Sequence, residues 1–250
     1  SIQEIENINI IAKEEGKTAH IAVRINPDID PGTHPYITTG KFNNKFGIHI
    51  NKKEKLFKTL KECKHIHFEG LHFHIGSQIT DLSVFKLLAL KANQTVKIFE
   101  KHGFKLSYLN MGGGLGIDYE EPEKNKVADF KNYFEIFDEY LIQSPGMNIH
   151  FELGRSITGQ CGSLITKVLY KKSGGSQTYL ITDAGLTELL RPALYGAKHK
   201  IINISTSGPL RQYSVAGPIC ETSDEFGRDV LLPETKRGDL LEIKSAGAYG

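Results

Sequence analysis

The sequence predicts an α/β domain over residues 1–155, followed by an antiparallel β-domain over residues 156–250. Helical and strand-like patterns of apolar residues alternate up to about residue 155, which is the order of a parallel sheet with crossover helices. From residue 156 onward, short runs of alternating apolar and polar residues are joined by turn residues, a pattern typical of antiparallel strands. About four strands precede residue 155, too few to close an eight-stranded barrel, so the first domain is either an open sheet or part of something longer.

The first domain is expected to begin with a helix over residues 2–15, because apolar residues recur there at helical spacing and Ser1 can serve as the N-cap. The run HIAVRINP at 20–27 then predicts a buried strand that ends at a proline turn. Three helix–strand pairs are expected after it, with the helices near 52–63, 81–102 and 128–143 and the strands at 65–76, 106–116 and 147–154.

The second domain is predicted from its turns and alternating residues. The segment SLITKVLYKKSGGSQTYLITDAG, at 163–185, contains two strand-like runs joined by a Gly-Gly turn. Further short strands are expected around 211–218, 228–232 and 239–244.

Composition excludes several classes of protein. The 31 basic and 29 acidic residues give a net charge of +2, which argues against a nucleic-acid-binding protein. No apolar run approaches the ~20 residues of a membrane span, so no membrane partner is expected. Three distant cysteines, Cys63, Cys161 and Cys220, indicate neither a disulfide framework nor a zinc site and favour a reducing compartment, the cytoplasm.

A glycine-rich segment, MGGGLGID at 111–118, follows the predicted strand at 106–116. Glycines at a strand end let backbone N–H groups approach a phosphate. The spacing is not that of a dinucleotide fingerprint, because Ile117 and Tyr119 stand where glycine would be required. A tight turn with no ligand remains the alternative.

Histidines alternate along the strand at 65–76. His65 and His67, like His72 and His74, each share one face of the strand, and such pairs can bind zinc. No third ligand is fixed by the sequence, so no metal site is predicted. The run HIGSQ at 74–78 places an aromatic base and a small hydroxyl-bearing turn at the end of a strand.

Three more segments carry candidate chemistry. Glu152 and Arg155 follow a predicted strand, where α/β proteins build sites, although a surface ion pair would also explain them. Arg191 and Tyr195 are four residues apart, so both can face one anionic group, and Arg favours a carboxylate. Cys220 precedes an acid, and is either a buried small hydrophobe or an exposed reactive thiol.

Taken in order, the segments HIGSQ, MGGGLG, ELGR, RPALYGA, CETSD and AGAYG resemble the fold-type III pyridoxal-phosphate-dependent decarboxylases over nearly all of the 250 residues. The resemblance implies that the first domain is the C-terminal portion of a pyridoxal-phosphate-binding (β/α)8 barrel of the alanine racemase-like type. It also implies a Greek-key or barrel-like β-domain that would continue beyond Tyr249.

The resemblance assigns cofactor-binding roles by position. His74 would stack on the pyridine ring, Ser77 and Gly112–Gly114 would bind the phosphate, and Glu152 would pair with the protonated ring nitrogen. Tyr249 would contact both phosphate and substrate. Leu153, Gly154 and Arg155 complete the cofactor segment, and Leu153 stands where the family usually has proline.

It also assigns the substrate site. Arg155, Arg191 and Tyr195 would hold a distal carboxylate, Glu221 a distal ammonium, and Cys220 would be the catalytic proton donor. In the family the last two come from the partner subunit, which implies a homodimer with shared active sites. The expected reaction is decarboxylation of meso-2,6-diaminopimelate to L-lysine. The alternatives are an ornithine- or arginine-type decarboxylase, a non-catalytic binding relative, or a barrel enzyme that acts on a sugar phosphate without a cofactor.

One feature of the family is not found in these residues. Its Schiff-base lysine lies in a YAVKAN-like motif well before HIGSQ. The segment LALKANQT at 88–95 contains Lys91, but within a helical pattern and after HIGSQ, so Lys91 is interpreted as a solvated helix residue. We therefore expect the chain alone to be inactive.

Overall fold

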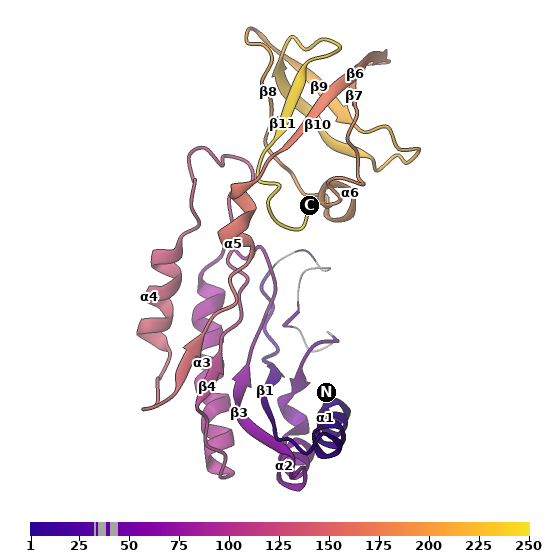
Figure 1. The fold of residues 1–250 in the computed structure, drawn as a ribbon. Coiled ribbons are helices and arrows are strands. Elements are labelled where there is room, and N and C mark those ends of the chain that lie inside the picture. Colours follow the sequence, from indigo (N-terminus) through magenta and orange to yellow (C-terminus); the bar gives the residue numbers. More distant parts are fainter. Residues whose placement is uncertain (33, 35–38, 41–44) are drawn as a thin grey trace. The chain divides into compact units, whose positions relative to one another are not determined.

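The structure is a computed structural model that describes residues 1–32, 34, 39–40 and 45–250. Contacts divide the chain into two compact units (Figure 1). The first contains residues 1–115 and 129–153, and the second contains residues 116–128 and 154–250. The domain assignment at 1–155 and 156–250 stays a prediction; the structure adds that residues 116–128 pack with the second unit.

The first unit contains a five-stranded parallel sheet with the order β2-β1-β3-β4-β5. Strands β1, β3, β4 and β5 lie side by side in chain order, which is the progression of a (β/α) barrel segment. This confirms the predicted α/β part. The strands are β1 (Ala19–Asn26), β2 (Ile48–His49), β3 (Ile66–His72), β4 (Tyr108–Asn110) and β5 (Asn148–His150). Strand β2 was not predicted, because two residues carry no detectable alternation.

Among the described residues, one α-helix precedes the first strand of this unit and three connect later strands. They are α1 (Ile2–Glu14), α2 (Lys53–Glu62), α3 (Ser83–Lys101) and α4 (Phe130–Tyr140). Helix α1 begins with the predicted cap: the Ser1 hydroxyl accepts from the Glu4 N–H, and the Glu4 side chain bonds back to the Ser1 backbone. A short 3₁₀ turn, Ile50–Lys52, precedes α2. No helix among the described residues is long and apolar enough to cross a membrane.

Large apolar side chains hold α3 and α4 together. Phe85 of α3 packs edge-on against Tyr133 of α4, with ring centroids 4.8 Å apart, and both rings are fully buried. Burying such rings stabilises a fold by roughly 1.5–3 kcal/mol each. This packing fixes the helices that precede and follow β4.

The register of the sheet sets the edge at which a site can form. His72, the last residue of β3, pairs with Asn110, the last residue of β4, which in turn pairs with His150, the last residue of β5. The segments that follow these residues therefore leave the sheet at one edge, as the carboxyl ends of parallel strands do.

The second unit contains a six-stranded sheet with the order β10-β9-β7-β6-β11-β8. Its strands are β6 (Leu164–Gly174), β7 (Gln177–Thr182), β8 (Ile201–Asn203), β9 (Leu210–Ala216), β10 (Glu225–Pro233) and β11 (Leu240–Ile243). Two short helices, α5 (Arg155–Thr158) and α6 (Arg191–Tyr195), and the 3₁₀ turn Gly159–Cys161 complete it. The core includes the fully buried Leu180, Val215, Leu241 and Ile243.

The prediction of a wholly antiparallel second domain needs correction. Strands β7 and β9 are parallel, while the other neighbouring pairs are antiparallel. The chain between β7 and β9 contains α6 and β8, which is long enough for the crossover that a parallel pair requires. Strand β8 is three residues long and was not predicted.

Candidate active site

A glycine turn lies where β3, β4 and β5 end. The Gly112 N–H donates to Asn110 Oδ1 at 2.8 Å, and its carbonyl accepts from the Glu152 N–H at 2.7 Å. Gly112 has a φ of +71°, and a Cβ there would lie 2.2 Å from the Phe73 carbonyl oxygen. A Cβ on Gly113 would lie 2.1 Å from the Glu152 carbonyl oxygen. Glycine is therefore required for the β4 and β5 extensions to come this close.

The HIGSQ turn lies beside this glycine turn. The Ile79 N–H donates to the Gly114 carbonyl at 2.9 Å, which brings the residues around Ser77 next to the glycines. Gln78 in this turn has a φ of +58°. Two turns with backbone held in unusual conformations thus meet at one edge of the sheet.

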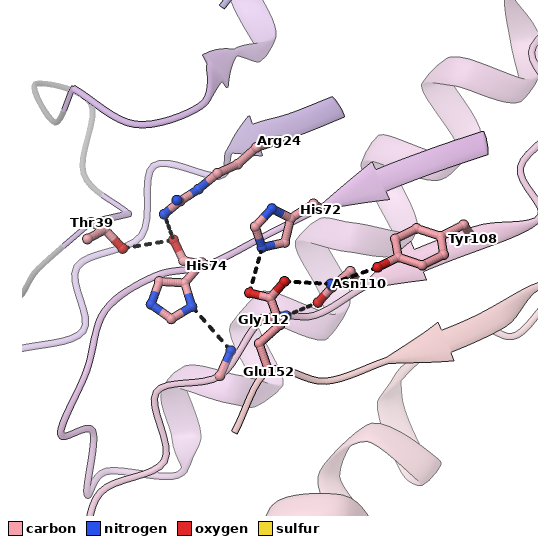
Figure 2. Close-up of polar contacts among 9 residues, drawn as sticks. Arg24, Thr39, His72, His74, Tyr108, Asn110, Gly112 and Glu152 are labelled. Carbon is pink, nitrogen blue, oxygen red and sulfur yellow. Dashed lines mark hydrogen bonds and ion pairs between the residues drawn. The ribbon is translucent and has the colours of Figure 1, made fainter. Parts of the chain in front are cut away.

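The Glu152 carboxylate is oriented by two side chains from neighbouring strands (Figure 2). Asn110 Nδ2 donates to Glu152 Oε1 at 2.9 Å, and His72 Nε2 lies 3.2 Å from Glu152 Oε2. The Glu152 side chain is 49% exposed. It is therefore fixed in direction and still open to a ligand.

His74 is held as a neutral imidazole. Its Nδ1 accepts from the Gly113 N–H at 3.2 Å, so the ring proton is placed on Nε2. Burial, together with the charges of Arg24 and His72, lowers the pKa of His74 to about 4. Figure 2 shows the ring beside the glycine turn.

Arg24 fastens the backbone at His74. Its Nη2 donates to the His74 carbonyl at 3.2 Å, and the Thr39 hydroxyl donates to the same oxygen at 3.0 Å. Burial lowers the pKa of Arg24. Neither Arg24, His72 nor Asn110 was predicted as a site residue. Arg24 and His72 could have been recognised as candidates from their positions near strand ends. Arg24 lies two residues before the end of β1, and His72 is the last residue of β3.

This edge of the first unit can hold an aromatic, phosphorylated cofactor. A carboxylate suits a protonated ring nitrogen, a neutral imidazole suits the face of an aromatic ring, and glycine backbone suits a phosphate. The structure thus brings the predicted His74, Gly112–Gly114 and Glu152 together, with Ser77 in the adjoining turn and Leu153 after the carboxylate.

The second unit holds a separate cluster of predicted residues around Tyr119. Arg155 Nη1 donates to the Tyr119 hydroxyl, and the Arg191 guanidinium carbon lies 4.2 Å from the centre of the Tyr119 ring. Arg155 and Arg191 are each 4% exposed. Arg155 also lies 4.7 Å from the ring of Tyr249, which is itself exposed. Gly154, before α5, is exposed, and Tyr195 is half-buried at the end of α6.

Arg191 also contacts a histidine that the sequence did not single out. Arg191 Nη1 lies 2.8 Å from His199 Nε2, and His199 Nδ1 lies 2.8 Å from the Lys244 carbonyl. Burial is the largest cause that lowers the pKa of His199 to about 4, and burial also lowers the pKa of Arg191.

Cys220 and Glu221 lie on an exposed loop between β9 and β10. The loop is organised by the buried Asp224, whose carboxylate accepts from the Leu186 N–H at 2.6 Å and the Ile219 N–H at 2.7 Å. Of the two alternatives for Cys220, a buried small hydrophobe or an exposed thiol, the structure shows the exposed thiol. Asp224 was missed as a structural residue, although it belongs to the CETSD segment.

Lys91 lies within α3, as predicted, and its side chain has intermediate exposure. Among the described residues, the one cluster with metal-like spacing is His20, His67 and Glu69. It contains neither His72 nor His74. The prediction that the protein binds no metal stays a prediction.

Comparisons with known proteins give a consistent result. Residues 1–159 match the family model described as "Pyridoxal-dependent decarboxylase, pyridoxal binding domain". The whole chain is 48% identical to diaminopimelate decarboxylase of Bacteroides thetaiotaomicron and 40% identical to that of Aquifex aeolicus. It covers 65% and 59% of those two proteins, so the chain spans less than two thirds of their length.

Solved structures agree with this result. Diaminopimelate decarboxylase from Helicobacter pylori, complexed with L-lysine, superposes with a TM-score of 0.91 at 39% identity, and the match covers all of this chain and 62% of that one. Diaminopimelate decarboxylase from M. jannaschii superposes with a TM-score of 0.86 at 37% identity, covering all of this chain and 58% of that one. Both resemblances extend through both units.

Proposed function

The chain belongs to the pyridoxal-dependent decarboxylase family, and on that premise we propose that its protein decarboxylates meso-2,6-diaminopimelate to L-lysine and CO2 with pyridoxal 5′-phosphate. The observation that carries the proposal is the Glu152 carboxylate, oriented by Asn110 and His72 beside a glycine turn and a neutral His74. The names of relatives up to 48% identical supply the substrate.

In this proposal the residues of the first unit hold the cofactor. When bound, pyridoxal phosphate supplies a protonated pyridine ring that accepts the electron pair left when CO2 departs. Glu152 would hold the proton on the ring nitrogen, since a carboxylate favours the charged form of a nearby base. His74 would lie against the face of the ring, and its neutral state would avoid a second positive charge there.

The phosphate is assigned to the two adjoining turns. The Gly112 N–H already donates to Asn110 Oδ1 and the Gly113 N–H to His74 Nδ1, so a phosphate bound by Gly112–Gly114 would take the Gly114 N–H directly and would share or displace the other two bonds. The Ser77 hydroxyl would add a donor from the neighbouring turn, and Tyr249 a further one. The tight packing behind the glycines, given by the added-Cβ distances of 2.2 and 2.1 Å, supports this rigid cradle.

The residues of the second unit would recognise the substrate. Arg155, Arg191 and Tyr195 would bind the distal carboxylate, because guanidinium groups match a carboxylate with paired donors. Glu221 would receive the distal ammonium, and the Cys220 Sγ–H would donate a proton to the α-carbon after CO2 leaves. The exposure of Cys220 and Glu221 supports their contribution to a second subunit's site, so the proposal includes a homodimer.

The proposal also covers Lys91 and the location of the protein. Lys91 is not the Schiff-base lysine, because it lies within α3 rather than at a strand end, so these 250 residues by themselves would be inactive.

A cytoplasmic location is included because all three cysteines are free, as thiols are in a reducing compartment.

The test is a decarboxylation assay with the complete protein. Diaminopimelate, ornithine, arginine and lysine would be supplied separately with pyridoxal phosphate, and CO2 and the amine product quantified. Diaminopimelate should be the preferred substrate and L-lysine its product. Preference for ornithine or arginine would retain the fold and cofactor and reject the substrate. Cofactor binding without turnover of any of these substrates would favour a non-catalytic binding relative.

A further inference from the structure

We propose that His199 and Tyr119 are positioning residues that hold the Arg191 guanidinium ready for the distal carboxylate of the substrate. The inference rests on the proposed function and deepens it. Neither residue belongs to the segments that carry the family resemblance, and both lie in the second unit with Arg191.

The first argument concerns charge. Arg191 is 4% exposed, and among the described residues it forms no ion pair with a carboxylate side chain. A buried guanidinium without a counter-ion is costly unless its N–H groups are satisfied or a ligand supplies the negative charge. Arg155, a second buried cation, shares Tyr119 with it. An anionic ligand would offset the charge of Arg191, with which no carboxylate side chain among the described residues pairs.

The second argument concerns the hydrogen bonds of His199. A carbonyl oxygen only accepts, so the 2.8 Å contact with the Lys244 carbonyl places the ring proton on His199 Nδ1. His199 Nε2 is then an acceptor, and it receives the bond from Arg191 Nη1 at 2.8 Å. Burial and the nearby arginines favour this neutral form. A neutral acceptor fixes the guanidinium without cancelling its charge.

The third argument concerns direction. Tyr119 lies against the guanidinium face, 4.2 Å from its central carbon, and meets the His199 ring edge-on at 4.8 Å between centroids. Tyr119 thus limits tilting, while His199 limits rotation in the plane. Because His199 occupies Nη1, the remaining edge of the guanidinium is Nε with Nη2. The Nε–H is buried and has no hydrogen-bond partner within the described part of the chain. A carboxylate would satisfy this edge with two parallel bonds.

The experiment compares His199→Leu with His199→Gln in the complete enzyme. Leucine removes both hydrogen bonds, whereas the glutamine amide retains one donor and one acceptor. We expect His199→Leu to raise KM for diaminopimelate about tenfold or more, with a much smaller change in kcat, and His199→Gln to stay within about threefold of wild type. His102→Leu, at an exposed histidine after α3, is the control and should leave both constants unchanged.

Cadaverine, the diamine that corresponds to L-lysine without its carboxylate, provides a readout that a merely structural role would not separate. The product L-lysine retains the carboxylate assigned to Arg191, so its inhibition constant should rise together with KM, whereas the inhibition constant of cadaverine should stay within about threefold of wild type in every variant. If His199→Leu does not fold, Tyr119→Leu and Tyr119→Phe form a second pair, because phenylalanine keeps the ring beneath Arg191 and leucine does not. Phenylalanine should preserve the KM for diaminopimelate better than leucine.

The outcomes separate the two hypotheses. A wild-type enzyme that does not decarboxylate diaminopimelate rejects the proposed function. An active wild type in which His199→Leu and Tyr119→Leu leave KM for diaminopimelate unchanged rejects only the positioning role. Parallel loss of affinity for diaminopimelate and cadaverine also rejects it, because cadaverine has no carboxylate and such a loss indicates general damage to the site.

Discussion

Asn110 Nδ2 donates a hydrogen bond to Glu152 Oε1 at 2.9 Å, so a side chain at the end of β4 orients a carboxylate that follows β5. The same amide nitrogen lies 2.9 Å from the Tyr108 hydroxyl, and Asn110 Oδ1 accepts from Gly112. A single asparagine thereby connects the carboxylate to the glycine turn. Because Asn110 and His72 orient the Glu152 carboxylate, a substitution that keeps its shape should change its charge without moving the side chain.

Glu152→Gln in the complete enzyme should bind pyridoxal phosphate and lose most of its decarboxylase activity. An amide has nearly the same shape but cannot stabilise a protonated ring nitrogen by charge. Cofactor absorbance and initial rates would be measured together. The matched control is Glu121→Gln, at an exposed acid paired with Lys124. A kcat within about twofold of wild type would show that Glu152 has a structural role only.

Arg191→Ala should lower kcat/KM for diaminopimelate by about 10²-fold or more, which corresponds to roughly 2.7 kcal/mol. The variant removes the donors assigned to the distal carboxylate, while the predicted phosphate contacts lie elsewhere. Cofactor binding should therefore be nearly unchanged. Arg228→Ala, at an exposed arginine paired with Glu225, is the control. Intact turnover of diaminopimelate in Arg191→Ala would remove Arg191 from the substrate site.

Gly112→Ala should destabilise the protein far more than Gly103→Ala. Both glycines have positive φ, at +71° and +85°, but a Cβ at Gly103 meets nothing within 4 Å, whereas one at Gly112 would lie 2.2 Å from the Phe73 carbonyl oxygen. We expect a loss of about 1 kcal/mol at Gly103 and at least about 3 kcal/mol at Gly112. Urea denaturation would measure both. Equal losses would mean that the neighbouring backbone moves aside easily.

Stability should fall as the pH drops from about 6.5 to about 4, because the pKa values of His74 and His199 are about 4 in the folded state and 6.5 ordinarily. In this range the unfolded chain binds more protons than the folded one. For the buried His199 the loss is on the order of 3 kcal/mol. Urea titrations across this range should show a shallower pH dependence in His199→Gln and an unchanged one in His102→Gln.

Borohydride reduction of this 250-residue chain with pyridoxal phosphate should give no stoichiometric adduct. Lys91 belongs to α3, whereas the candidate cofactor residues follow the ends of β3, β4 and β5, so labelling should be scattered over surface lysines. Peptide mass spectrometry would locate the label, and Lys91→Arg should not change its total amount. A single equivalent on Lys91 would contradict this prediction.

Patterns in the sequence predicted the long elements and the order of the fold. Helix α3 was found because six apolar residues recur at helical spacing, and β1 because the strand-like run HIAVRINP ends at a proline turn. Strands β2 and β8 are too short to show a pattern. The parallel pairing of β7 with β9 depends on a crossover through α6, which local alternation cannot reveal.

The candidate site was predictable only in part, because sequence motifs do not reveal contacts between residues that are distant along the chain. His74, Glu152 and Arg191 stand in recognisable segments, whereas Asn110 and His199 act through contacts set by tertiary structure. His199 is 45 residues from Lys244, whose carbonyl fixes its tautomer. No spacing rule connects two such positions, so their roles become visible only once the chain is folded.

The excursion of residues 116–128 into the second unit has a consequence for dissecting the protein. The chain leaves the first unit after Leu115, returns at Asp129 and leaves again after Leu153, so neither unit is a continuous stretch of polypeptide. A truncation that ends at Leu153 would remove Arg155, Arg191 and His199, three residues that contact Tyr119. During synthesis, Tyr119 likewise leaves the ribosome well before Arg155, Arg191 and His199. Its packing contacts with them can therefore form only after the chain has been made as far as His199. Expressing either unit alone would therefore call for a circularly rearranged or loop-replaced gene rather than a simple cut.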